Sequence, residues 1–108
     1  MFRLDANPSF WTTVAVRSPD GETELGSFRA EFRALTISEL EGFDITTGAG
    51  ARALLEAALA AIDEVEDDDG SPLALTPQSF ARLADINHVR QALLTAFLGA
   101  IGGARRGN

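Results

Sequence analysis

A single histidine is the only side chain in this sequence suited to general acid–base chemistry near neutral pH. His88 has Asp85 three residues before it, and the nearest hydroxyl groups in the sequence are those of Ser79 and Thr95. A serine–histidine–aspartate site would also need a nucleophile elbow and an oxyanion motif, which the sequence does not contain. We therefore expect His88 to be a helix cap or a surface residue. A small hydrolase that uses His88 is the alternative from a different functional class.

An acidic run over residues 63–70 is the second feature that could do chemistry, since clustered carboxylates can bind calcium. An EF-hand loop with its glycine at Gly70 would place its first ligand at Val65 and its last at Thr76, and neither residue fits. The acidic run and the single histidine also lack the ligand spacing that zinc or iron needs. We expect a solvated loop that ends in an Asp-Gly turn, with no metal and no cofactor.

The composition excludes several further chemistries. The 108 residues include no cysteine, tyrosine or lysine, so disulfides, thiolate metal sites, Schiff bases and P-loops are ruled out. Sixteen acidic residues against nine arginines give a formal net charge of −7, which disfavours binding to the phosphate backbone of nucleic acids. The longest mostly apolar stretch, residues 92–104, is too short for a membrane span. We expect one soluble cytoplasmic domain, not an enzyme.

The N-terminal third predicts an antiparallel β-hairpin over residues 10–35. Residues 10–17 are rich in β-forming side chains, and residues 25–35 alternate apolar and polar side chains. Between them, residues 18–21 (Ser-Pro-Asp-Gly) have the sequence of a tight turn. One face of the hairpin should therefore be packed and the other solvated.

The remainder predicts helices. A capping box at Thr36 and Glu39 starts a short helix over residues 37–43, and an apolar stripe marks a firm helix over residues 51–62. Thr76 and Pro77 start another helix, and Asn87 is a plausible cap for the last one, which Gly102-Gly103 should end. The predicted fold class is α+β: a single domain over residues 1–108, with the hairpin packed on three or four helices within residues 37–101 and a loose tail over residues 102–108.

Two apolar regions are candidates for binding a partner. The last helix carries a wide apolar stripe, for which core packing is the default, and we expect some of Leu94, Phe97, Leu98 and Ile101 to reach outward to a partner or to a second copy of the chain. Of the two regions we favour the outward side of this helix, around Leu94, Leu98 and Ile101, as the binding surface. Phe10 and Trp11 are neighbours in a strand and must point to opposite faces. Either one of the two is exposed at an interface, or both faces of the strand are covered.

In their order, these segments resemble the small tail assembly chaperones of long-tailed (siphovirus-type) bacteriophages and prophages. The resemblance spans roughly residues 10–108 and rests on the strand–turn–strand start, the capped Ser38-Glu39-Leu40, the aliphatic helix that leads into the acidic turn, the Leu75-Thr76-Pro77 helix start and the last helix from Asn87. Two positions depart from the pattern. Ala61-Ile62-Asp63 stands where many relatives have a tryptophan, and Ala74 stands where a larger apolar residue is expected.

The resemblance implies a non-enzymatic assembly factor with no catalytic residues, no cofactor and no membrane or nucleic-acid partner. Such proteins bind the tape-measure protein in the host cytoplasm and keep it soluble until tail-tube subunits assemble around it. They are absent from the mature virion, and in many relatives a frameshifted longer form recruits the tube subunits. A head–tail connector or a tail-tube component is the alternative within phage biology. We also expect a homo-oligomer, because the apolar surface that holds a client could pair with a second copy.

Overall fold

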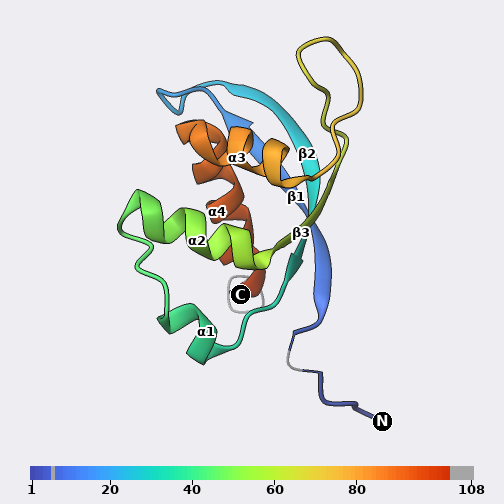
Figure 1. Ribbon diagram of the computed structural model, residues 1–108, viewed down its shortest axis with the longest axis vertical. Coiled ribbons are helices and arrows are strands. Elements are labelled where there is room, and N and C mark those ends of the chain that lie inside the picture. The colour runs from blue at the N-terminus through green and yellow to red at the C-terminus, as the bar shows by residue number, and fades with distance from the viewer. Residues whose placement is uncertain (6, 103–108) are drawn as a thin grey trace.

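The computed structural model describes residues 1–5 and 7–102, which form a three-stranded antiparallel sheet and four helices (Figure 1). The strands, in the sheet order β1-β2-β3, are β1 (Ser9–Arg17), β2 (Glu24–Arg33) and β3 (Leu59–Asp63). The helices are α1 (Ile37–Glu41), α2 (Gly48–Ala58), α3 (Pro77–Asp85) and α4 (Asn87–Ile101). This arrangement confirms the predicted α+β class.

The N-terminal hairpin forms as its alternating pattern predicts. β1 and β2 pair in a register that places Phe10 opposite Phe32 and Val14 opposite Phe28. Gly21 adopts a φ of 78° in the connecting turn and donates its N–H to the Ser18 carbonyl at 2.8 Å, as expected for a glycine in a tight turn. Phe28, Ala30 and Phe32 of β2 are buried on one face of the sheet, which we call the inner face.

The helix predicted over residues 51–62 is wrong beyond Ala58. Leu59–Asp63 leave the helical path and pair with β2 as the third strand, with Asp63 opposite Arg29 and Ala61 opposite Glu31. Without β3, the edge of β2 that faces away from β1 would expose unpaired backbone N–H and C=O groups. Pairing with β3 supplies hydrogen-bond partners for them. Leu59 still reaches the core because it lies opposite Phe32 across a local irregularity in the register.

Helix caps explain where the short helices start. Thr36 and Glu39 form the predicted capping box of α1, although α1 ends at Glu41. Thr76 caps α3 with Pro77 in its first turn, as predicted. The prediction that Asn87 caps the last helix is wrong. The N-cap position falls on Ile86, and Asn87 lies inside the first turn of α4.

Beyond its first turn, α4 matches the sequence prediction closely. Gly102 follows its last residue, as expected. The rest of the predicted tail, residues 103–108, lies outside the described residues.

The core lies between the inner face of the sheet and the helices. Phe32 and Phe97 are fully buried, with ring centroids 5.2 Å apart, and Phe10 stacks on Phe97 at 6.5 Å. α4 therefore packs directly against β1, and α2 and α3 pack against α4 in turn. In the part of the chain that the structure describes, no helix is long and apolar enough to cross a membrane.

Candidate functional site

The apolar residues of α4 divide into a buried set and an outward set. Leu93 and Phe97 are fully buried. Leu94, Leu98 and Ile101, which we call the α4 row, follow i, i+4, i+7 spacing and so share one side of the helix. Leu94 and Leu98 are half-buried against the core, and Ile101 is exposed. The row is thus partly available for contact with another molecule.

A shallow groove continues the α4 row toward the start of α2. It has a volume of about 160 Å³, and its walls include Leu94, Arg90 and Gln91 of α4 and Ile45, Thr46 and Thr47 before α2. Ile45 is an exposed large apolar side chain. Sequence reasoning missed Ile45, because nothing in the local pattern places residues 44–47 beside α4.

The strand candidates Phe10 and Trp11 have different environments. Phe10 is half-buried and stacks on the core ring of Phe97, so its side chain is engaged in packing. Trp11 points to the opposite face of the sheet, which we call the outer face, and it is exposed. The structure therefore does not bring the five predicted partner-binding residues together into one surface.

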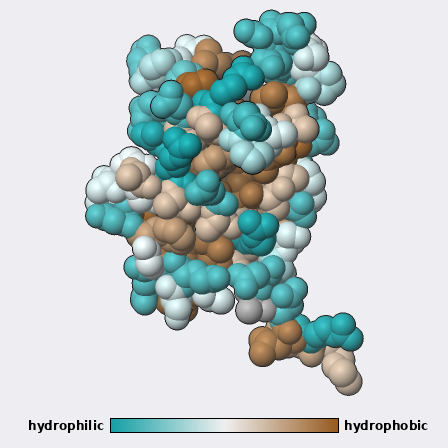
Figure 2. All heavy atoms as spheres, in the orientation of Figure 1, coloured by the Kyte–Doolittle hydropathy of each residue, from teal (hydrophilic) through white to brown (hydrophobic). Residues whose placement is uncertain are grey.

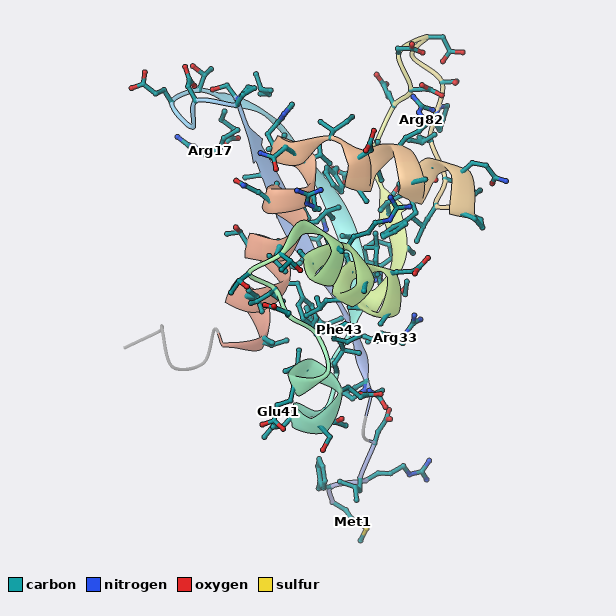
Figure 3. All side chains as sticks on the ribbon, turned by 60° about the vertical axis from the view of Figure 1, so that its left-hand side comes forward. Met1, Arg17, Arg33, Glu41, Phe43 and Arg82 are labelled. Carbon is teal, nitrogen blue, oxygen red and sulfur yellow. The ribbon has the colours of Figure 1, made fainter. Side chains whose placement is uncertain are left out.

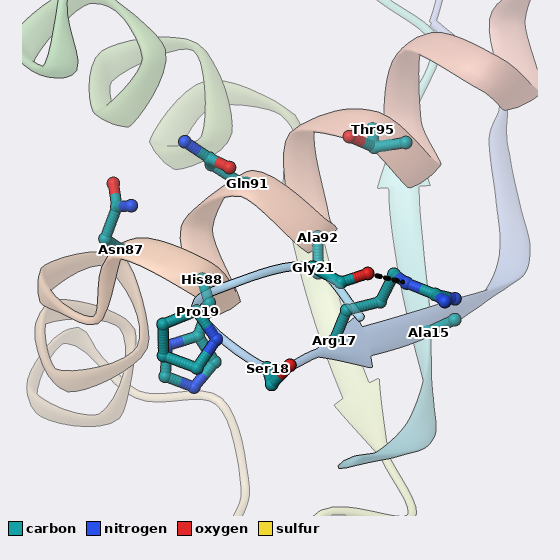
Figure 4. A pocket seen from close by; sticks show the side chains of 10 residues that line it. All are labelled: Ala15, Arg17, Ser18, Pro19, Gly21, Asn87, His88, Gln91, Ala92 and Thr95. Carbon is teal, nitrogen blue, oxygen red and sulfur yellow. Dashed lines mark hydrogen bonds between the residues drawn. The ribbon is translucent and has the colours of Figure 1, made fainter. Parts of the chain in front are cut away.

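His88 lies in a polar pocket of about 200 Å³ between the start of α4 and the hairpin turn (Figure 4). Arg17, Ser18 and Pro19 form the opposite wall, and the Nε of Arg17 donates to the Gly21 carbonyl at 3.0 Å. Thr95 lines the same pocket, but it is two helical turns from His88, a rise of about 10 Å along the axis.

The other two groups of the possible serine–histidine–aspartate set are also separate. Ser79 is buried, and its hydroxyl donates to the Ala74 carbonyl at 2.7 Å and accepts from the Thr76 N–H at 2.8 Å. It is part of the reciprocal cap of α3. Across residues 1–5 and 7–102, no hydrogen bond joins His88 to Asp85, Ser79 or Thr95.

The acidic loop uses one of its carboxylates in an ion pair. Carboxylate oxygens of Asp67, Asp68 and Asp69 lie within 4.8 Å of one another, which is close enough for a metal ion. Asp67, however, accepts from both terminal nitrogens of Arg82, at 2.8 and 3.2 Å. These hydrogen bonds from Arg82 hold the pKa of the Asp67 carboxyl well below its usual range. The hydroxyl and N–H of Ser71 lower the pKa of Asp69 in the same way.

An N-terminal arm, residues 1–5, is a further exposed apolar feature (Figure 3, Met1). Phe2 and Leu4 are 82% and 85% exposed, more than any large apolar side chain in the helices and strands. Residues 1–5 mix charged and apolar side chains, and no local pattern in them predicts a binding segment. The signal that could have identified this segment is that Phe2 and Leu4 precede the predicted hairpin, which offers no strand position for their side chains.

Comparisons of the chain with protein-family models, with curated proteins and with solved structures gave no match.

Proposed function

We propose that this protein is a phage or prophage tail assembly chaperone that binds the tape-measure protein and keeps it soluble while the tail tube assembles. The observation that carries the proposal is the α4 row beside its groove. Three aliphatic side chains on one side of a helix are only partly used by the core, and Ile45 extends their apolar surface. The order of sequence segments that resembles this chaperone family supports the same function.

The client's chemistry matches such a surface. A tape-measure protein is long, largely helical and prone to aggregate, and an amphipathic helix binds by laying its apolar side into a groove beside another helix. The anchors of a bound helix would repeat at i, i+3, i+4 and i+7, the same spacing as the α4 row. Arg90 lines the groove, where its guanidinium donates to the Ala84 carbonyl at 3.2 Å and to the Asn87 side-chain oxygen at 3.0 Å and so fixes the groove wall.

The charge of the chain supports a holding role. A formal net charge of −7 on 108 residues keeps a complex soluble by repulsion while its apolar surface covers the client. In this proposal the protein acts in the host cytoplasm, catalyses no reaction and leaves before the virion is complete. A frameshifted longer form would recruit the tail-tube subunits.

Replacing Ile101 with glutamate tests the client surface. Co-expression of the Ile101→Glu variant with the tape-measure protein from the same genome should lower client binding by about tenfold or more, which is about 1.4 kcal/mol. Ile86→Glu is the matched control, because Ile86 is 43% exposed against 38% for Ile101 and precedes the other end of α4. Circular dichroism and a thermal melt establish that both variants are folded. Equal client recovery by the two variants would contradict the assignment of the α4 row.

Two further measurements separate this proposal from its alternatives. His88→Ala should retain the client, because His88 is not among the residues that line the groove beside the α4 row and, within residues 1–5 and 7–102, no hydrogen bond joins it to a nucleophile. Loss of tail assembly in a folded His88→Ala variant would favour the hydrolase alternative.

Mass spectrometry of purified virions should not detect the chain. Its presence at stoichiometric amounts would instead indicate a connector or a tail-tube component.

A further inference from the structure

Among the described residues, the apolar side chains of the N-terminal arm are not part of the core or of the side chains packed against it. Met1, Phe2 and Leu4 are the most exposed large apolar residues in the described chain. Figure 2 shows apolar atoms of this segment standing clear of the body of the molecule. Exposed apolar groups that gather in one place mark interaction sites in soluble proteins.

The arm leaves the body at a fixed point. The side-chain amide of Asn7 donates to the Ala34 carbonyl and to the Glu39 carboxylate, both at 2.9 Å. The Ala34 N–H donates to the Pro8 carbonyl at 2.8 Å. These bonds anchor the base of the arm beside the Ser9 end of β1.

A groove at the other end of the sheet has complementary chemistry. The hairpin groove has a volume of about 240 Å³ and is lined by Val16, Leu25, Phe28, Val65 and the two carboxylates that flank Val65 in sequence, Glu64 and Glu66. Leu25 is 58% exposed, so its side chain is left without a full apolar environment. An apolar floor with acidic groups at its edge fits a ligand that carries apolar and basic side chains.

The arm is such a ligand. In an extended segment Phe2 and Leu4 point to one side and Arg3 to the other, so the two apolar side chains can enter a groove together while Arg3 faces its edge. The two charged side chains of the arm, Arg3 and Asp5, cancel in the formal count, so the net charge of −7 belongs to the rest of the protein. Arg3 is the group of the arm that the acidic groove attracts.

The arm cannot reach the hairpin groove of its own chain. From the anchor at Asn7 to Phe2, five residues span at most about 18 Å when fully extended. From Ser9 to Val16, the strand covers seven residues, or about 23 Å, and Asn7 lies beyond Ser9. Figure 3 shows Met1 at one end of the molecule and Arg17, the last residue of β1, toward the other.

We propose that the N-terminal arm of one copy binds in the hairpin groove of a second copy, with Phe2 and Leu4 against Leu25 and Val65 and Arg3 near Glu64 and Glu66. Because arm and groove lie at opposite ends of the sheet, two antiparallel copies can exchange arms reciprocally and close a two-fold dimer. This inference uses residues outside the α4 row and does not depend on the proposed function.

Disulfide cross-linking tests the contact in a chain that has no cysteine of its own. A mixture of Leu4→Cys and Leu25→Cys proteins, each in the full chain, should give a mixed disulfide dimer under mild oxidation. Leu4→Cys mixed with Ile86→Cys is the control, because Ile86 is also exposed but does not line the groove. We expect a yield about tenfold above this control. Equal yields in the two mixtures would overturn the proposal.

Sedimentation equilibrium supplies a second readout without oxidation. The unmodified chain should form a dimer, and Arg3→Glu should raise the dissociation constant by about tenfold, which is about 1.4 kcal/mol. Adding Glu66→Arg to Arg3→Glu should restore the dimer by reversing the charge pair. The arm is exposed in the monomer, so Arg3→Glu should leave the melting temperature of the monomer unchanged. A chain that stays monomeric up to millimolar concentration would overturn the proposal.

Discussion

Three polar side chains, those of Ser79, Arg33 and Asp67, hold the fold through hydrogen bonds. The Ser79 hydroxyl closes the cap of α3, and the Arg33 guanidinium donates twice to the Ala57 carbonyl, at 2.8 and 3.2 Å, near the C-terminal end of α2. Asp67 is paired with Arg82. Within residues 1–5 and 7–102, every buried side-chain nitrogen or oxygen has a hydrogen-bond partner. These assignments leave no buried polar side chain without a hydrogen-bond partner in the described part of the chain.

The ion pair between Asp67 and Arg82 should make stability depend on acid pH. Arg82 lowers the pKa of Asp67 in the folded state. The ion pair therefore contributes fully to the free energy of unfolding above the pKa of an unfolded aspartate, about 3.9, and this contribution is lost progressively as the pH falls below that value. We predict that Asp67→Asn melts at a lower temperature than the unmodified chain at pH 7. The difference should shrink when both proteins are melted at pH 3.

The neighbouring Asp68→Asn is the control for this ion pair, because Asp68 forms no salt bridge with Arg82. Its melting temperature at pH 7 should stay close to that of the unmodified chain. An Asp67→Asn deficit that is constant from pH 7 to pH 3 would show that the carboxylate charge does not matter.

Elements whose signals are local could be predicted from the sequence, and the element that depends on a distant partner could not. The hairpin turn at residues 18–21 and the caps at Thr36 and Thr76 are each encoded within four residues, and the structure confirms them. β3 is different, since residues 59–63 continue the helical apolar spacing of α2 and include two alanines. Residues 59–63 instead pair with the edge of β2, about 30 residues earlier in the chain, and this pairing outweighs their helical spacing.

The start of α2 offers a sharp test of local packing. Gly50 lies against the Asp44 carbonyl oxygen, and a Cβ at this position would overlap that oxygen. The Asp44 carbonyl cannot retreat easily, because it accepts from the N–H and the hydroxyl of Thr47, the N-cap residue. We predict that Gly50→Ala destabilises the fold by about 1–3 kcal/mol, although alanine favours helices by about 1 kcal/mol. The melting temperature should fall by roughly 4 °C or more.

Gly48→Ala is the matched control two residues earlier in the same helix. A Cβ at Gly48 would make only an ordinary contact with the Arg90 guanidinium, at 3.6 Å. This variant should therefore keep the stability of the unmodified chain or raise its free energy of unfolding by up to about 1 kcal/mol. Its melting temperature should stay the same or rise. Equal losses in both variants would show that the close approach to Asp44 does not limit residue 50.

The helices pack on only one face of the sheet, so the α4 row and the exposed Trp11 lie on opposite sides of it. The helices cover the inner face of the sheet, while the outer face carries Trp11, Thr13, Arg29 and Glu31 (Figure 1). The wide apolar stripe of the last helix marks its outward side as a candidate surface, and the structure leaves Ile101 exposed while Leu94 and Leu98 are half-buried. The N-terminal arm and Ile45 could not be predicted in the same way, because their exposure depends on where distant segments pack.

Trp11 can report which face a client uses, because it is the only tryptophan in the chain and is exposed on the outer face. A tape-measure segment without tryptophan, bound on the α4 row, should leave the emission maximum of Trp11 and its quenching by acrylamide unchanged. The α4 row belongs to the helix that covers the inner face, so the sheet lies between it and the indole. A blue shift with protection from acrylamide would place the client on the outer face and contradict the α4 assignment. Ile101→Glu, titrated in parallel, provides the non-binding baseline.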